Sequence, residues 1–274
     1  MQWILRDIDD TVKLAETLDR SGIPYSWHKV VPFVGTLDPE PVVPNPDAVV
    51  MFGPYSMWRA AKAAGYKPGV FVLRPFVNEL VWHPYLLNGA DAWFITLRDV
   101  PAKVTADDTD WFVRPVADNK EMAGTVMTGA EIVQTAERVL KLKPREIPRG
   151  SLRHDTELML SEPVRIMKEW RLWAVDGKIV TWSLYKEGAR VVHRPEIDDD
   201  ALAFAQRMVD INPGYSQAYV IDVCRTADGL RLLETNNINS AGFYAADLTK
   251  LVMAIEDLTP PHVRHDLAGY YCPA

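Results

Sequence analysis

Cysteine is scarce in this sequence, and long apolar runs are missing. The 274 residues include only Cys224 and Cys272, and neither belongs to a C-x-x-C pair. We therefore expect neither a disulfide framework nor a zinc ribbon, and a reducing compartment suits the chain. No apolar run approaches the roughly 18 residues that a membrane span needs, and the first residues lack the apolar core of a signal peptide. The sequence predicts a soluble, cytoplasmic protein without a membrane partner.

A basic excess and two common catalytic motifs are also missing. The chain has 30 Lys and Arg against 37 Asp and Glu, which gives a net charge of −7. That balance argues against a broad nucleic-acid-binding surface. Because neither a G-x-S-x-G elbow nor a G-x-x-x-x-G-K-[ST] loop occurs, the sequence indicates neither a serine hydrolase nor a P-loop NTPase.

The first hundred residues alternate between predicted strands and helices. Apolar segments at 3–5, 47–53 and 70–73 are typical of buried strands, and each helical segment between them ends at a glycine. This β-α-β-α-β order indicates a small parallel α/β domain, which we assign to residues 1–100.

The pattern changes near Val100. A strand at 111–115, a polar loop at 117–121 and a helix from about Ala130 precede two long hairpins. We therefore predict a second domain at 101–274 with antiparallel sheets, and an α/β (α+β) fold class for the whole chain.

The first hairpin has predicted strands at 169–175 and 178–185. A two-residue Asp176-Gly177 turn would pair 175 with 178, whereas a three-residue turn with a left-handed Gly177 would pair 174 with 178. We prefer the three-residue turn because it separates apolar from polar side chains. The apolar face then holds Trp170, Leu172, Ala174, Val180, Trp182 and Leu184. The polar face holds Glu169, Arg171, Thr181, Ser183 and Tyr185.

The second hairpin runs from Tyr219 to Asn236. A three-residue turn at 227–229 sets Asp222 opposite Glu234, and Asn236 then points to the same face. Facing carboxylates repel unless a cation or proton lies between them. Since Mg²⁺ takes one or two carboxylates together with phosphate oxygens and water, these three side chains suit a magnesium site.

Taken alone, the same residues also suit simpler roles. The three oxygen-bearing side chains could be solvated on an open sheet face, and Glu169 with Arg171 could form a cross-strand ion pair. Lys120 could be an ordinary loop lysine.

An ordered series of motifs resembles the ATP-grasp family. The series is F-V-R-P, D-N-K and a glycine at 112–124, E-W-R at 169–171, and E-T-N-N-I-N-S-A-G-F-Y at 234–244. More narrowly it is similar to a divergent bacterial and phage branch, related to a eukaryotic cell-division-cycle protein that assists assembly of a translation initiation factor. The resemblance covers about 100–255, and the preceding α/β unit looks like the domain that usually precedes an ATP-grasp module.

The resemblance implies ATP and Mg²⁺ as cofactors and assigns the site residues. Arg114 and Lys120 would contact ATP phosphates from the smaller lobe, and Arg171 would contact phosphate or a developing acyl phosphate. The nucleotide site would also include Glu169 and Lys186, with Arg171 and Lys186 as the catalytic cations. The residues implied to hold Mg²⁺ are Asp222, Glu234 and Asn236. Lys186 falls on the apolar face in the preferred register, so its role requires a bend or bulge near Tyr185.

These assignments imply an ATP- and Mg²⁺-dependent ligase that joins a carboxylate to an amine through an acyl phosphate. Its partners would be ATP and the two substrates, one of which could be a peptide or protein or a small amino acid. One alternative is an ATP-binding assembly factor that clamps a protein partner without ligation. A metal-dependent hydrolase that uses the same acidic face is another.

Overall fold

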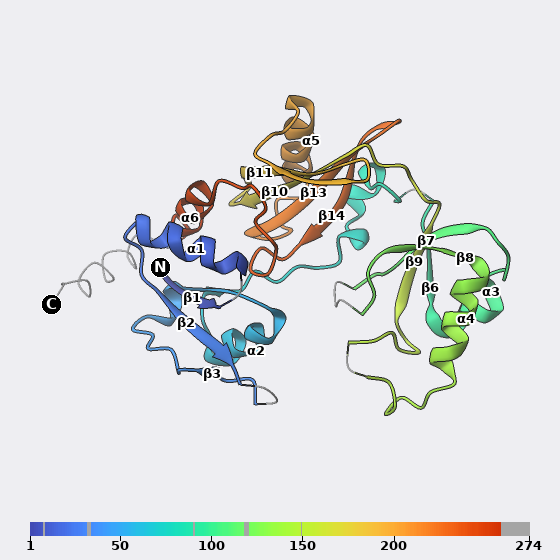
Figure 1. The fold of residues 1–274 in the computed structure, drawn as a ribbon, viewed down its shortest axis with the longest axis horizontal. Helices are drawn as coiled ribbons and strands as arrows, with labels where there is room; N and C mark the ends of the chain where they lie inside the picture. The colour runs from blue at the N-terminus through green and yellow to red at the C-terminus, as the bar shows by residue number, and fades with distance from the viewer. Residues whose placement is uncertain (8, 32–33, 90, 118–120, 149, 259–274) are drawn as a thin grey trace.

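Three sheets organise the chain (Figure 1). The computed structural model describes residues 1–7, 9–31, 34–89, 91–117, 121–148 and 150–258. Lys120 lies outside these residues. Nowhere in the described part of the chain is a helix both long and apolar enough to span a membrane. The mixed architecture confirms the predicted fold class, with an N-terminal α/β unit and antiparallel sheets after it.

The N-terminal unit is a five-stranded sheet in the order β3-β2-β1-β4-β5. Its elements are β1 (Gln2–Arg6), α1 (Asp9–Arg20), β2 (Tyr25–Val30), β3 (Leu37–Asp38), β4 (Val49–Phe52), α2 (Tyr55–Ala64) and β5 (Pro68–Gly69). Strands β1, β2, β4 and β5 pair in parallel, as the alternating pattern predicted. The strand predicted at 70–73 is wrong, because β5 ends at Gly69, and β2 was not anticipated.

The small lobe is a four-stranded antiparallel sheet in the order β6-β9-β7-β8. Its elements are β6 (Trp93–Thr96), α3 (Val100–Lys103), β7 (Asp110–Pro115), β8 (Thr125–Thr128), α4 (Gly129–Leu140) and β9 (Glu157–Ser161). Helix α4 begins at a capping box, in which Thr128 and Glu131 bond each other's backbone N–H groups. Strand β6, which pairs with β9 in this sheet, lies before residue 100. The division into domains at 1–100 and 101–274 stays a prediction.

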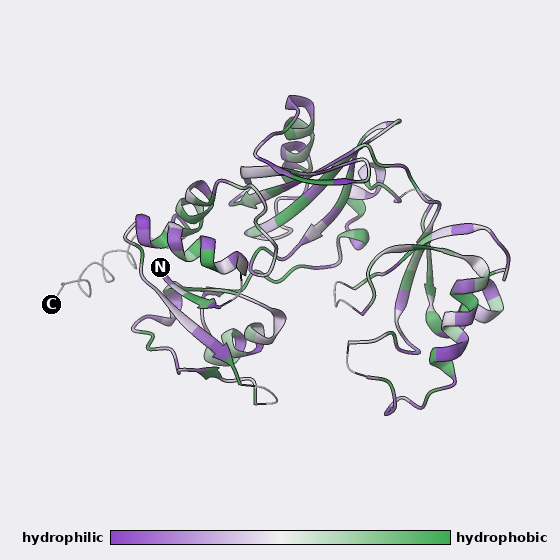
Figure 2. Ribbon diagram, viewed as in Figure 1, coloured by the Kyte–Doolittle hydropathy of each residue, from purple (hydrophilic) through white to green (hydrophobic). Residues whose placement is uncertain are grey.

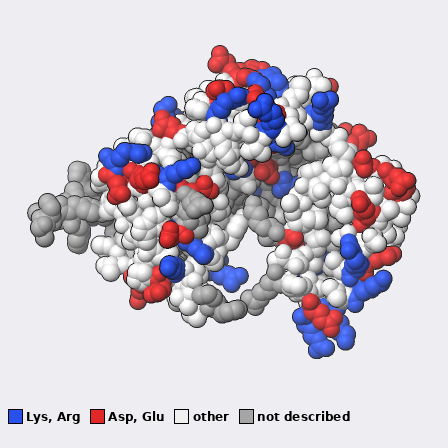
Figure 3. Space-filling model, viewed as in Figure 1, with Lys and Arg blue, Asp and Glu red and all other residues white. Residues whose placement is uncertain are grey.

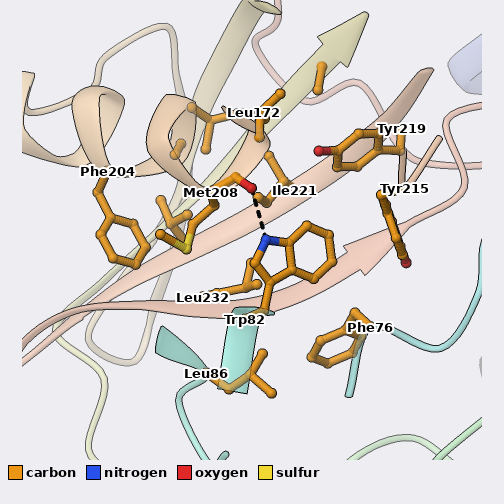
Figure 4. Close-up of a cluster of buried hydrophobic side chains, with 14 of the residues drawn as sticks. Phe76, Trp82, Leu86, Leu172, Phe204, Met208, Tyr215, Tyr219, Ile221 and Leu232 are labelled. Carbon is orange, nitrogen blue, oxygen red and sulfur yellow. Dashed lines mark hydrogen bonds between the residues drawn. The ribbon is translucent and has the colours of Figure 1, made fainter. Parts of the chain in front are cut away.

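The large sheet is antiparallel, in the order β12-β11-β10-β13-β14. Its elements are β10 (Lys168–Val175), β11 (Lys178–Glu187), β12 (Arg190–Arg194), α5 (Asp199–Asp210), β13 (Ala218–Thr226), β14 (Gly229–Asn236) and α6 (Leu248–Glu256). Apolar residues follow its strands and the inner sides of its helices (Figure 2). One face packs under α5 and the 3₁₀ turn Leu80–Tyr85, where Trp82 donates its indole N–H to the Met208 carbonyl at 2.8 Å (Figure 4).

The opposite face of this sheet changes character along the strands. At one end Trp173, Val175 and Val220 share a core with the N-terminal sheet and α6. At the other end the same face presents Arg171 and Asp222, which are directly paired across β10 and β13. One half of this face therefore packs against the N-terminal unit, and the other half carries polar side chains.

The turn predicted for the first hairpin is wrong, although most of the predicted faces are right. Val175 pairs with Lys178 across a two-residue Asp176-Gly177 turn, in which both residues have positive φ. A bulge at Val180 then shifts the pairing again and restores the predicted faces, although Trp173 lies opposite Thr181, two residues away from the predicted pairing. As a consequence Val180 packs against the core on the other face of the sheet, not on the predicted apolar face.

The second hairpin shows the same correction. Thr226 pairs with Gly229, so the turn has two residues and not three. A bulge at Leu233 shifts the register back, and Asp222 lies opposite Glu234 as predicted. Each bulge compensates for the shorter turn, because one extra residue reverses the facing of every later side chain.

Candidate active site

A cavity of about 350 Å³ lies between the small lobe and the large sheet. Its polar lining comes from both sides, with Arg114 on β7 facing Glu169, Tyr185 and Glu234 on the large sheet. The apolar lining consists of Phe76, Val77, Leu86, Leu87, Phe112, Pro115, Ala117, Met122, Ala123, Met159 and Leu233. We call it the interlobe cavity. Figure 3 shows the molecule hollowed between the N-terminal unit and the small lobe, below the large sheet. The size and mixed lining of the interlobe cavity are those of small-molecule sites.

The three side chains predicted to hold a metal lie together beside this cavity. The Asn236 amide donates to Glu234 at 3.0 Å and to Asp222 at 3.4 Å. Asp222 is fully buried. Two carboxylates and one amide fit the oxygen-donor preference of Mg²⁺, which fills its other positions with phosphate oxygens and water. Within the described ranges no group of three His, Cys, Asp or Glu is arranged to hold a metal ion.

Arg171 forms a buried ion pair with Asp222. Its Nε and Nη2 donate to the two Asp222 oxygens at 2.9 and 2.7 Å. Burial raises the pKa of Asp222 to about 6, and the Arg171 charge limits this shift by favouring the carboxylate. A divalent cation beside the same carboxylate would act in the same direction as Arg171.

Two tyrosines enclose the Arg171 guanidinium. It lies 5.7 Å from the ring centre of Tyr185 and 4.9 Å from that of Tyr244, and it donates to the Tyr244 hydroxyl at 3.4 Å. Tyr244 has φ +50°, a conformation that few non-glycine residues adopt. Its ring also stacks on His193. These contacts fix the direction of Arg171, which lines a second cavity.

Glu169 contacts Lys186, the remaining predicted cation of the large sheet. It accepts a hydrogen bond from the Tyr185 hydroxyl at 2.7 Å and an ion pair from Lys186 at 2.8 Å. The bend required for Lys186 is present, because a bulge at Tyr185 places Lys186 opposite Glu169. Arg114 pairs with Glu234 across the lobes at 3.3 Å, its guanidinium 5.0 Å above the Phe76 ring.

Two further cavities adjoin the interlobe cavity. The polar cavity, about 300 Å³, is lined by Tyr55, Arg171, Glu234, Asn236, Asn237, Ser240, Ala241, Gly242 and Tyr244. The apolar cavity, about 220 Å³, is lined by Tyr55, Trp58, Leu73, Arg74, Pro75, Phe76, Arg114, Val116, Ala117, Thr235 and Asn237. The interlobe cavity shares Glu234 with the polar cavity and Arg114 with the apolar cavity, and the polar and apolar cavities share Tyr55 and Asn237.

The segment after β14 joins the N-terminal unit to this site. Asn239 accepts from the Phe71 N–H at 2.9 Å and donates to the Met51 carbonyl at 2.7 Å. Asn237 donates to the Phe71 carbonyl. Sequence reasoning gave no role to Tyr55, Asn237 or Tyr244. The last two lie inside the motif 234–244, whereas no local signal marked Tyr55.

A family model described as an ATP-grasp domain, family 3 of its clade, matches residues 45–255. The chain belongs to this ATP-grasp family. Solved structures with the same fold include an ATP-grasp RimK domain protein from Sphaerobacter thermophilus DSM 20745, at 12% identity and a TM-score of 0.63 over 94% of this chain and 99% of that chain. D-cycloserine synthetase DcsG has 14% identity and a TM-score of 0.59 over 95% and 100%.

The ligase neighbours of this ATP-grasp protein also include D-alanyl-alanine synthetase A from Vibrio cholerae. It is 11% identical, with a TM-score of 0.57 over 94% of this chain and 98% of that chain. At these identities the neighbours show the fold alone. No curated protein matches the chain in sequence.

Proposed function

We propose that this ATP-grasp protein is an ATP- and Mg²⁺-dependent ligase that joins a carboxylate to an amine through an acyl phosphate. The observation that carries the proposal is the convergence of Asp222, Glu234, Asn236, Arg114 and Arg171 where the interlobe and polar cavities meet. Family membership supports ATP as the nucleotide. A neighbour of the same fold, the ATP-grasp ligase PsnB, was solved with Mg and ADP.

In this proposal the oxygen-bearing side chains bind the metal and the cationic side chains bind the phosphates. Asp222, Glu234 and Asn236 would hold Mg²⁺, which when bound neutralises phosphate charge. Arg114, with Lys120, would contact the phosphates from the small lobe, while Glu169 and Lys186 would complete the nucleotide site on the large sheet. Phosphoryl transfer requires mainly positioning and charge stabilisation, so a site with several cationic side chains suits it.

Arg171 is placed to act on the carboxylate substrate. Two of its nitrogens are used by Asp222, and its side chain lines the polar cavity beside Glu234. A carboxylate in that cavity would lie against the guanidinium, which would stabilise charge on the acyl phosphate as it forms.

A peptide is one substrate that fits this proposal. PsnB, which has a TM-score of 0.54 and 15% identity to this chain, was solved with a minimal precursor. The relationship to an initiation-factor assembly protein stays a prediction. Stable capture of one protein partner with ATP binding but without amide formation would favour that alternative over ligation.

The test measures ADP release from purified protein supplied with ATP, Mg²⁺ and acid–amine pairs. We expect Glu234→Gln to lower Mg²⁺-dependent turnover about 100-fold, because the cation loses a charged ligand. Glu187→Gln is the matched control, since Glu187 lies on the same sheet in a surface ion pair with Arg194. Equal turnover in the two variants would show that the metal assignment is wrong.

A further inference from the structure

The polar and apolar cavities present contrasting chemistry on either side of Tyr55 and Asn237. The polar cavity offers a guanidinium, amides and hydroxyl groups beside the predicted metal site. The apolar cavity is walled mainly by Trp58, Leu73 and Phe76, together with Pro75, Val116 and Ala117. A molecule that spans both would carry a charged end and an apolar group.

The charged groups around the apolar cavity already have partners. Arg74 donates to both oxygens of Glu79, at 2.8 and 3.2 Å. Arg114 pairs with Glu234. The Thr235 hydroxyl is 2.7 Å from the Tyr215 hydroxyl. An acidic ligand group would therefore have to compete with Glu79 or Glu234 for these two cations, which favours an apolar group in this cavity.

The volume of this cavity suits a ring or a branched alkyl group. A dry protein cavity of about 150 Å³ lined by apolar side chains accommodates benzene, and the apolar cavity measures about 220 Å³. The N-terminal unit supplies Tyr55 and Trp58 from the first turn of α2, whose rings lie 4.0 Å apart. The lining therefore combines rigid aromatic surface with room for a large side chain.

We propose that the carboxylate substrate of the ligase carries a large apolar or aromatic group, which occupies the apolar cavity while its carboxylate faces Arg171. This inference rests on the proposed function and names the substrate class of the same site. A carboxylate oxygen bonds to the γ-phosphorus, the bond from that phosphorus to the ADP oxygen breaks, and ADP leaves with the electron pair.

The acyl phosphate can be trapped with hydroxylamine. Its nitrogen attacks the acyl carbon, inorganic phosphate leaves, and the nitrogen releases a proton to water, which yields a hydroxamate. We would supply ATP, Mg²⁺ and hydroxylamine with glycine, leucine, phenylalanine or glutamate, and measure both ADP and hydroxamate. We expect kcat/KM for leucine and phenylalanine to exceed that for glycine and glutamate by roughly tenfold or more.

Two neighbouring positions give a matched pair of variants. Leu73 lines the apolar cavity, whereas Val72 is exposed. We expect Leu73→Asp to lower kcat/KM for phenylalanine at least tenfold without changing the dissociation constant for ATP, and Val72→Asp to leave both unchanged. Trp58→Ala tests the same wall if Leu73→Asp does not fold, and the same loss is expected.

Each outcome bears on a separate claim. Equal rates with all four acids, a preference for glycine or glutamate, or no turnover with any of them while ATP binds normally would overturn the inference and leave the nucleotide site standing. Equal effects of the two Asp variants would also overturn it. Failure to bind ATP with Mg²⁺ would overturn the proposed function itself, and the inference with it.

Discussion

Arg171 and Asp222 combine a structural role with a chemical one at the scale of single residues. Removing one partner of a buried ion pair leaves an uncompensated charge. Here the pair also directs the guanidinium towards the polar cavity. The side chains around it, Tyr185 and Tyr244, contribute aromatic faces on both β11 and the segment after β14. Arg171 is therefore held by charge, hydrogen bonds and ring contacts together.

We predict that Arg171→Lys lowers ligase turnover roughly 100-fold while ATP affinity changes much less. A lysine keeps the charge but cannot make the two parallel hydrogen bonds to Asp222, so the cation is no longer aimed. The measurement is steady-state ADP release together with ATP binding by calorimetry. Arg194→Lys is the control, because Arg194 lies on the same sheet in surface ion pairs. A similar loss in both variants would contradict the role assigned to Arg171.

Strand periodicity explains why most of the candidate residues could be predicted. Asp222, Glu234 and Asn236 alternate on adjacent strands, so one register assignment places all three together. Tyr55 and Trp58 could not be found in this way, because they reach the site from the N-terminal unit through tertiary contacts. No spacing within the sequence relates α2 to β14.

At the scale of elements, the two hairpins show where prediction from turn residues ends. An Asp-Gly pair suits a two-residue turn, and the observed positive φ of Asp176 and Gly177 agrees with it. The separation of polar and apolar faces nevertheless favoured a three-residue turn. Both signals were correct, because the bulges at Val180 and Leu233 reconcile a short turn with the favoured faces. A bulge has no sequence signature as clear as that of a turn.

The segment after β14 yields a prediction at the same scale. We expect Asn239→Ala to lower the free energy of unfolding by roughly 2–4 kcal/mol, because it leaves the buried Phe71 N–H and Met51 carbonyl unpaired. Urea unfolding followed by circular dichroism measures the change. Asn78→Ala should change stability by less than about 0.5 kcal/mol, since Asn78 is exposed. A loss no larger than that of this control would show that Asn239 does not join the two units.

At the scale of the whole molecule, the cores indicate which parts move together. The N-terminal sheet and the large sheet share one core, which includes Trp3, Phe52, Trp173 and Val220. The small lobe has a core of its own, drawn entirely from residues 93–160. Arg114 and Glu234 link the two sides across the interlobe cavity through an ion pair at 3.3 Å. The small lobe meets the core of the large sheet only at its margin among the described residues, through Val116 and Met159 with Phe112 packed against them, so rotation of this lobe would disturb a small shared contact.

We predict that a non-hydrolysable ATP analogue with Mg²⁺ brings the small lobe closer to the N-terminal unit. The phosphates would attract Arg114 from one side and the metal site from the other, which favours a closed interlobe cavity. Spin labels at the exposed positions Leu142 and Val42 should approach each other by several ångströms in pulsed electron paramagnetic resonance. Labels at Val42 and Val191, which lie on units with a shared core, should keep their separation. If both pairs changed, or if neither did, the small lobe would not be the part that closes on the nucleotide.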